Sequence, residues 1–173
     1  ETEAGEPFIR IGYAEQQFIL AEAVLRKWIT GEGAEAYYRS GIRAAMEFTA
    51  ANTPVKYRHG VKIDDAYIAS YLEGPQVKFG ASAAENLNRI YKQKYMLYFL
   101  QHEWDAFFEC RRTGVPELPV NPSTNMNTDP SKMPVRWMYP QTEYDRNNAN
   151  VMEAIARQYD GLDNENCVMW LLK

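Results

Sequence analysis

The sequence is poor in the residues that build metal sites, disulfide frameworks and membrane spans. Its 173 residues include two cysteines, Cys110 and Cys167, and two histidines, His59 and His102. Two cysteines form one bridge at most, and we expect packed thiols instead, because buried free cysteine is common. No apolar run approaches the length of a transmembrane helix, and the N-terminal ETEAGEPF has no signal-peptide pattern.

An excess of basic charge is also missing. Lysine and arginine number 19 against 23 acidic residues, which gives a net charge of −4 and a pI near 5.3. Nucleic-acid-binding proteins need a basic surface, so the composition argues against a nucleic-acid partner. Hydrophobic residues make up 46% and aromatic residues 13% of the chain. This predicts one domain, or a large piece of one, with a large core or an aromatic binding surface.

Motifs for metal binding and catalysis begin in this sequence but are not completed. The stretch HEWDA opens at His102 like a zinc-protease helix, which needs a second histidine four residues later, where Ala106 stands. Nearby carboxylates that could act as acid and base are Glu103, Asp105 and Glu109. With Arg111 and Arg112 beside them, we interpret this region as a salt-bridged helix end. Nucleophile elbows, phosphate loops and dinucleotide glycine patterns are absent too, so we predict no catalytic residue, metal ligand or cofactor.

A calcium-loop pattern also begins and then fails. Its alternating oxygen-bearing residues are Asn125, Asn127 and Asp129. Pro130 and Arg136 stand where the calcium loop needs glycine and glutamate. We therefore interpret the three residues as loop formers, because asparagine and aspartate stabilise turns through their own side chains.

Helical periodicity dominates the first third of the chain. Apolar residues spaced by three and four predict helices over 11–28 and 34–50, and the short link between them predicts an antiparallel hairpin. The hairpin partly resembles a tetratricopeptide unit at Phe18, Ala21, Leu25, Ala34, Tyr38 and Gly41. Glu22 stands where that unit prefers a small residue, so an ordinary hairpin explains the pattern equally well.

Two further helices are predicted before residue 113. Asp64 and Asp65 are suited to cap a short helix over 66–73. Ser82 and Glu85 form a capping-box pattern that opens a long helix over 83–112. The long helix is apolar on all sides between residues 95 and 100, so we expect it to be buried. The predicted core residues are Phe18, Leu25, Tyr38, Leu97, Leu100, Trp104 and Phe108.

The long helix should end at Arg111-Arg112-Thr113-Gly114. Cations in a last turn favour the negative end of the helix dipole, and Gly114 can adopt the left-handed conformation that closes a helix. An anion-binding role for the two arginines is the alternative. We expect no regular structure over 115–148 except short turns, then a last helix over 151–159, capped by Asn150 and stopped by Gly161.

Four stretches in this order resemble the C-terminal portion of the SusD/RagB family of nutrient-binding outer-membrane lipoproteins of Bacteroidetes, in its SusD-like branch. They are YAEQQFILAEAVLRKWITGEGAEAYYRSGIRAAMEF, NRIYKQKYMLYFLQHEWDAFFECRRTG, MPVRWMYPQTEYDRNNANV and the closing CVMW. The resemblance implies an all-α fold with a tetratricopeptide-like scaffold and a long irregular wrapping loop. It implies that residues 1–173 are the C-terminal portion of a single domain whose N-terminal part is absent.

The resemblance also implies a function and partners. Family members are not enzymes; they capture oligosaccharides, or in some branches peptides, for a TonB-dependent SusC-like transporter. They are lipid-anchored at the cell surface in the outer membrane, and the anchor is not in this chain. A helical-repeat module that binds another protein is the runner-up, and an all-helical enzyme is a third hypothesis.

The wrapping segment is expected to have structural rather than ligand-binding roles. Its matching residues are Arg136, Tyr139, Pro140, Glu143, Asn147 and Asn150. We expect Arg136 to pair with Glu143, Pro140 to fix a turn, and the asparagines to cap the last helix. Trp137 and Tyr139 could stack on a sugar ring, although core packing of aromatics is more common. We assign no ligand-contacting residue.

Because the helices here cover only part of the apolar helix, we expect the isolated chain to be marginally stable.

Overall fold

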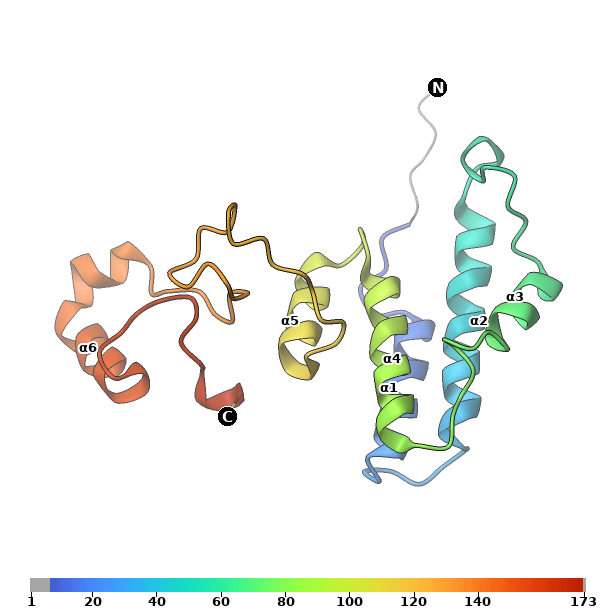
Figure 1. Ribbon diagram of the computed structural model, residues 1–173, viewed down its shortest axis with the longest axis horizontal. Helices are drawn as coiled ribbons and strands as arrows, with labels where there is room; N and C mark the ends of the chain where they lie inside the picture. Colours follow the sequence, from blue (N-terminus) through green and yellow to red (C-terminus); the bar gives the residue numbers. More distant parts are fainter. Residues whose placement is uncertain (1–6, 173) are drawn as a thin grey trace. The chain divides into compact units, whose positions relative to one another are not determined.

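The computed structural model describes residues 7–172, and all regular structure in that range is helical (Figure 1). This confirms the all-α prediction. The chain divides into two units, Glu1–Pro116 and Glu117–Lys173. Each unit is described on its own below.

The first unit is built on an antiparallel hairpin of α1 (Tyr13–Leu25) and α2 (Ala34–Asn52) (Figure 1). The two helices approach closely at Gly41, where an added Cβ would lie 2.7 Å from Cε1 of Phe18. Phe18 and Tyr38 are each 1% exposed, which confirms them as core residues. The hydroxyl of Tyr38 donates to the carbonyl of Val77 at 2.9 Å, so this buried polar group is satisfied. The sequence thus predicted the hairpin correctly.

The first helix is shorter than predicted at both ends. Ile11 and Trp28 lie outside α1 and are 80% and 67% exposed. Lys27 has a φ of 60°, a left-handed conformation that ends the helix. Leu25 is partly buried against the core.

The short elements that follow match the sequence closely. A 3-10 turn, η1 (Val55–Tyr57), precedes α3 (Asp65–Leu72). The carboxylate of Asp64 accepts a hydrogen bond from the amide of Tyr67 at 3.0 Å, so the predicted cap is confirmed. Ile68 and Leu72 of α3 pack into the same core as the hairpin.

The prediction of one helix over 83–112 is wrong. The structure has α4 (Ala83–Tyr98) and α5 (Glu103–Thr113), separated by a break in which Leu100 has a φ of 59°. In one straight helix the Cα atoms of Lys94 and Glu109 would be roughly 22 Å apart, at 1.5 Å per residue. Instead Nζ of Lys94 lies 2.6 Å from Oε1 of Glu109, because α5 turns back against α4. The break contains no glycine or proline, so local sequence gives no signal for it.

The break also overturns part of the predicted core. Leu100, Trp104 and Phe108 are 85%, 56% and 40% exposed, whereas Leu97 packs partly buried against the core. Continuous helical periodicity placed these side chains on one buried face, and the break rotates them out of register.

The ends of α4 and α5 were predicted with mixed success. Ser82 is the residue before α4, but its side chain makes no capping hydrogen bond, so the capping box is wrong. Asn86 instead accepts from the amide of Gly80 at 2.7 Å and donates to its carbonyl at 2.8 Å. At the end of α5, Gly114 has a φ of 71° and closes the helix as predicted.

The second unit consists of an irregular segment, one kinked helix and a short closing turn. α6 (Gln141–Tyr159) begins ten residues earlier than predicted and has a kink at Asn147, where φ is −142°. The expectation of no regular structure is therefore wrong over 141–148. Side chains in the first turns of α6 are polar and mostly exposed, so they carry no apolar period to detect. Asp160 and Gly161 are left-handed and end α6 near the predicted stop, before η2 (Trp170–Leu172).

The cysteines are both free. Cys110 is partly buried, and burial raises the pKa of its thiol. Sγ of Cys167 lies 3.4 Å from the carbonyl of Leu162. Within its own unit, each cysteine is thus a partly buried thiol.

Candidate functional site

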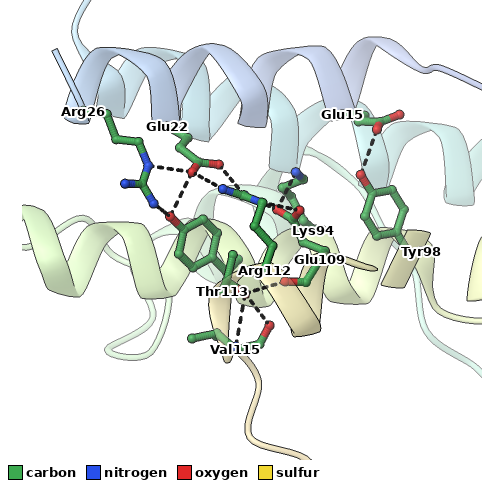
Figure 2. A network of polar contacts seen from close by, with 10 residues as sticks. Glu15, Glu22, Arg26, Lys94, Tyr98, Glu109, Arg112, Thr113 and Val115 are labelled. Carbon is green, nitrogen blue, oxygen red and sulfur yellow. Dashed lines mark hydrogen bonds and ion pairs between the residues drawn. The ribbon is translucent and has the colours of Figure 1, made fainter. Parts of the chain in front are cut away.

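The most highly connected polar site of the first unit is centred on Glu22 of α1 (Figure 2). Glu22 is 5% exposed, and its carboxylate accepts hydrogen bonds from three side chains. Nε of Arg26 lies at 2.7 Å and the Tyr91 hydroxyl at 2.9 Å. Both terminal nitrogens of Arg112 bind the two carboxylate oxygens at 2.8 Å, a bidentate pair. Glu22 therefore links α1 to α4 and α5.

A second carboxylate extends this network. Glu109 of α5 accepts from Nζ of Lys94 at 2.6 Å and from Nη2 of Arg112 at 2.7 Å. Lys94 is 5% exposed, so its charge is compensated inside the protein rather than by water. We call these six residues the Glu22 network: Glu22, Arg26, Tyr91, Lys94, Glu109 and Arg112.

The electrostatics of the Glu22 network favour its charged form. Burial alone would raise the pKa of Glu22, but hydrogen bonds from Arg112, Arg26 and Tyr91 outweigh burial and lower that pKa to about 2. Burial also opposes the charge on Glu109, and hydrogen bonds from Arg112 and Lys94 hold its pKa below the ordinary value. Hydrogen bonds to both carboxylates raise the pKa of Arg112. These carboxylates are thus stable anions at neutral pH and are poorly suited to proton transfer.

The chemistry of the Glu22 network is structural. Each of its charged groups pairs with another group of the same chain. Arg112 binds an anion, but that anion is the Glu22 carboxylate of the same chain rather than a ligand. Its place in the last turn of α5 agrees with the predicted helix-dipole role. Sequence reasoning missed this role of Glu22. The available signal was a glutamate on the apolar face of the first helix, at a position where a small residue was expected.

The residues of the HEWDA stretch take simple roles. Nδ1 of His102 lies 3.3 Å from Oδ2 of Asp105, and the His102 ring stacks tilted against Phe8 with centroids 5.0 Å apart. The salt-bridged helix end is confirmed for Glu109 with Arg112. The side chain of Glu103 lies outside the described residues. Among the side chains that the structure describes, which leave out Glu103, no group of three or more histidine, cysteine or acidic residues is placed to hold a metal.

The first unit also contains a groove of about 540 Å³, which we call the α1–α2–α4 groove. Its walls are the start of α1, the second half of α2 and the end of α4, and Phe18 and Ile42 lie at its base. The hydroxyl of Tyr98 donates to Oε1 of Glu15 at 2.7 Å in its wall, as Figure 2 shows. Burial and this hydrogen bond raise the pKa of Tyr98, so the phenol keeps its proton. The volume lies within the range of small-molecule pockets.

In the second unit, Arg136 is a buried charged residue around which other side chains pack. It pairs with Asp163, not with Glu143, so the predicted pair is wrong. Its guanidinium lies 4.1 Å from the ring centroid of Tyr159 and 5.7 Å from that of Tyr139. Asp163 is far from Arg136 in sequence, which is why local pairing rules selected the exposed Glu143 instead.

The other residues of the wrapping segment vary in outcome. Pro140 directly precedes α6. Asn150 lies inside α6 and does not cap it; its side-chain amide donates to Oδ1 of Asn147 at 2.6 Å. Tyr139 packs against Arg136, in line with a structural role. Trp137 is 56% exposed and is not a core residue.

The calcium-like residues form the loop, as interpreted from the sequence. The side-chain amide of Asn125 donates to the carbonyls of Pro130 and Lys132 at 2.9 and 2.8 Å. Asn127 donates to the Lys132 carbonyl at 2.7 Å. Asp129 accepts from the amide and hydroxyl of Ser131 at 3.0 and 2.6 Å. These oxygens and amides serve the turn itself.

Comparison with known proteins adds the family. Residues 2–140 match the model of the SusD-like family described as starch-binding and associating with the outer membrane. The chain belongs to this SusD-like family. None of the curated proteins matches it. Among its described helices, none is long and apolar enough to span a membrane.

Solved structures of the SusD-like family resemble the chain over nearly its whole length. A SusD homologue from Bacteroides fragilis is 47% identical with a TM-score of 0.91, covering 100% of this chain and 37% of that one. A second from the same species is 42% identical with a TM-score of 0.83, covering 97% and 36%. A Bacteroides vulgatus protein described as an outer-membrane protein involved in nutrient binding is 35% identical with a TM-score of 0.84, covering 100% and 36%. The chain thus spans little more than a third of these relatives.

Proposed function

We propose that residues 1–173 are the C-terminal portion of a single SusD-like domain, and that the whole protein binds an oligosaccharide or a peptide as a nutrient. The observation that carries this proposal is the 47% identity over the entire chain to a SusD homologue. The description of the matched family as starch-binding and of one relative as nutrient-binding supports the ligand class. The two ligand classes remain open, since sugar and peptide sites both combine aromatic side chains with a few polar groups.

Binding without chemical conversion fits the electrostatics of this portion. The two carboxylates of the Glu22 network, Glu22 and Glu109, form ion pairs with cations of the same chain. A general acid needs a pKa near the working pH, whereas these pKa values are lowered. This supports a binding protein over an enzyme.

We place the whole protein at the cell surface as a lipid-anchored component of the outer membrane, together with a TonB-dependent SusC-like transporter. The support is the association with the outer membrane in the family description and the Bacteroides vulgatus relative. Purification of the full-length protein from detergent-solubilised outer membranes tests this placement. Co-purification of a barrel transporter is the expected result, and recovery of the protein in the soluble fraction alone would contradict it.

Turnover and binding are best measured in one sample. The full-length protein is incubated with individual oligosaccharides and peptides, and the recovered ligand is analysed by mass spectrometry. We expect at least one ligand to be retained and recovered unchanged. Conversion of the ligand would favour an enzyme. Retention of a protein partner with no small ligand would favour the helical-repeat interaction module.

A further inference from the structure

The loop that joins α2 to α3 is basic, although the chain as a whole is acidic. Residues 54–63, PVKYRHGVKI, contain two lysines, one arginine and one histidine but no acidic residue, whereas the whole chain has a net charge of −4. We call residues 55–62 the basic loop. All of them are exposed, and they follow the end of α2 that lies opposite the α1–α2 connection (Figure 1). A short, exposed stretch rich in lysine and arginine is typical of a surface that binds polyanions.

Hydrogen bonds within the chain hold the basic loop in shape. The guanidinium of Arg58 donates to the carbonyls of Thr53 and Ala50 at 2.8 and 3.1 Å, so the loop is tied to the end of α2. Both acceptors are neutral and leave the positive charge of Arg58 in place. At the other end of the loop, Nζ of Lys62 lies 3.1 Å from Oδ2 of Asp64, the residue that caps α3. A surface that is ordered before its ligand arrives loses less entropy on binding.

The tip of the basic loop offers backbone amides as well as cations. The amide of Val61 donates to the carbonyl of Arg58 at 2.8 Å, and the two residues between them, His59 and Gly60, have φ values of 48° and 77°. Arg58 is right-handed, with φ −77° and ψ −10°. A right-handed residue followed by a left-handed one turns successive amides toward the same side, where an anion can bind. In the described chain, neither His59 nor Gly60 donates its amide to a carbonyl.

Tyr57 adds an exposed aromatic ring to these cations and amides. It is 56% exposed, and Nζ of Lys56 lies 4.8 Å from its ring centroid. A sugar ring can pack its apolar face on a tyrosine while nearby cations bind its charged substituents. The other exposed apolar side chains of the loop, Val55 and Val61, are small. Segments that insert into a membrane surface use tryptophan, phenylalanine or leucine instead, so the loop fits a sugar better than a bilayer.

We propose that the basic loop binds an acidic oligosaccharide, whose sugars carry sulfate or carboxylate groups. The inference rests on the proposed function, and it narrows the nutrient of the whole protein to an anionic sugar. Tyr57 packs on a sugar ring, and the Lys56 ammonium with the amides at the tip of the loop binds the anionic groups. Arg58 holds the loop on α2. The family description as starch-binding supports a saccharide, and the charge of the loop selects an acidic one over neutral starch.

The first experiment measures which charge the ligand needs. The full-length protein is titrated calorimetrically with a hyaluronan tetrasaccharide, which carries carboxylates, a carrageenan tetrasaccharide, which carries sulfates, and neutral maltotetraose. We expect at least one acidic tetrasaccharide to bind at least about tenfold more tightly than maltotetraose. Its affinity should fall as sodium chloride is raised from about 50 to about 500 mM, because salt screens exposed charges. Comparable affinity for maltotetraose, or no binding of either acidic tetrasaccharide, would overturn the inference.

The second experiment locates the site on the chain. Lys56→Gln and Tyr57→Ala are compared in the full-length protein with Lys92→Gln and Tyr67→Ala, which remove an exposed lysine from α4 and a 44% exposed tyrosine from α3. We expect each loop variant to weaken binding of the acidic tetrasaccharide at least about fivefold, and each control to change it less than about twofold. Thermal unfolding checks that all four variants are folded. Binding that both loop variants leave unchanged would place the ligand elsewhere and refute the assignment.

The outcomes separate this inference from the proposed function. A neutral oligosaccharide or a peptide that binds while no acidic tetrasaccharide does would overturn the inference and leave the nutrient-binding function intact. Conversely, an acidic tetrasaccharide that binds through Lys56 and Tyr57 but is cleaved would remove the non-enzymatic function and keep the site. Sedimentation with phosphatidylglycerol vesicles that Lys56→Gln abolishes, without binding of an acidic tetrasaccharide, would make the loop a membrane contact and overturn the inference.

Discussion

Replacing Glu22 by glutamine tests the electrostatic account of the first unit most sharply. The carboxyl pKa falls from an ordinary value of 4.5 to about 2 in the folded protein. This difference corresponds to about 3 kcal/mol of stability, since one pKa unit is worth about 1.4 kcal/mol. A glutamine oxygen still accepts one hydrogen bond, so we expect Glu22→Gln to destabilise the protein by about 2 to 3 kcal/mol at pH 7.

The pH dependence distinguishes this effect from a packing defect. Because the folded pKa of Glu22 is depressed, its stabilisation is complete above pH 4.5 and is lost as the pH falls toward 2. The difference in unfolding free energy between wild type and Glu22→Gln should therefore shrink over that window.

The assay is urea unfolding of the full-length protein, followed by circular dichroism at several pH values between 7 and 2. The matched control is Glu47→Gln, which removes a carboxylate from an exposed pair with Arg43. Exposed pairs contribute little, so the control should change stability much less. A loss for Glu22→Gln that equals the control, or that is the same at pH 7 and pH 2, would refute the reasoning.

Three further changes test single features of the fold by thermal or urea unfolding. Gly41→Ala places a Cβ 2.7 Å from the Phe18 ring and should destabilise by about 1–3 kcal/mol through overpacking; no loss would mean that the helices are less tightly packed. Gly114→Ala forces an L side chain to a φ of 71° and should cost about 1 kcal/mol, whereas a stabilised variant would contradict the left-handed cap. Arg136→Met leaves a buried carboxylate unpaired and should cost about 3–5 kcal/mol, while Glu143→Gln should be nearly neutral; the reverse order would restore the pair expected from sequence.

The sequence predicted those parts of the fold that depend on local periodicity and caps. The hairpin, the cap at Asp64 and the left-handed Gly114 each follow from residues within one or two helical turns. The same local rules failed between α4 and α5. There the ion pairs of Glu109 and Arg112 with residues of other helices bend the chain, and no residue of the break itself favours an interruption.

In the candidate site, too, the sequence predicted local features but not contacts between residues far apart in the chain. Arg112 was recognised as a last-turn cation, but its partner, Glu22, lies ninety residues earlier in the chain. Arg136 was recognised as a paired arginine, yet its partner is Asp163 rather than the nearer Glu143. A single sequence gives the type of an interaction through residue chemistry, while the partner depends on which elements pack together.

Isothermal titration calorimetry of the full-length protein against a panel of oligosaccharides and peptides tests the central claim most directly. The account predicts saturable binding of at least one member of the panel, with no heat from a continuing reaction after the titration ends. Binding to no member, by a protein shown to be folded through its cooperative unfolding, would contradict the claim that this chain belongs to a nutrient-binding protein.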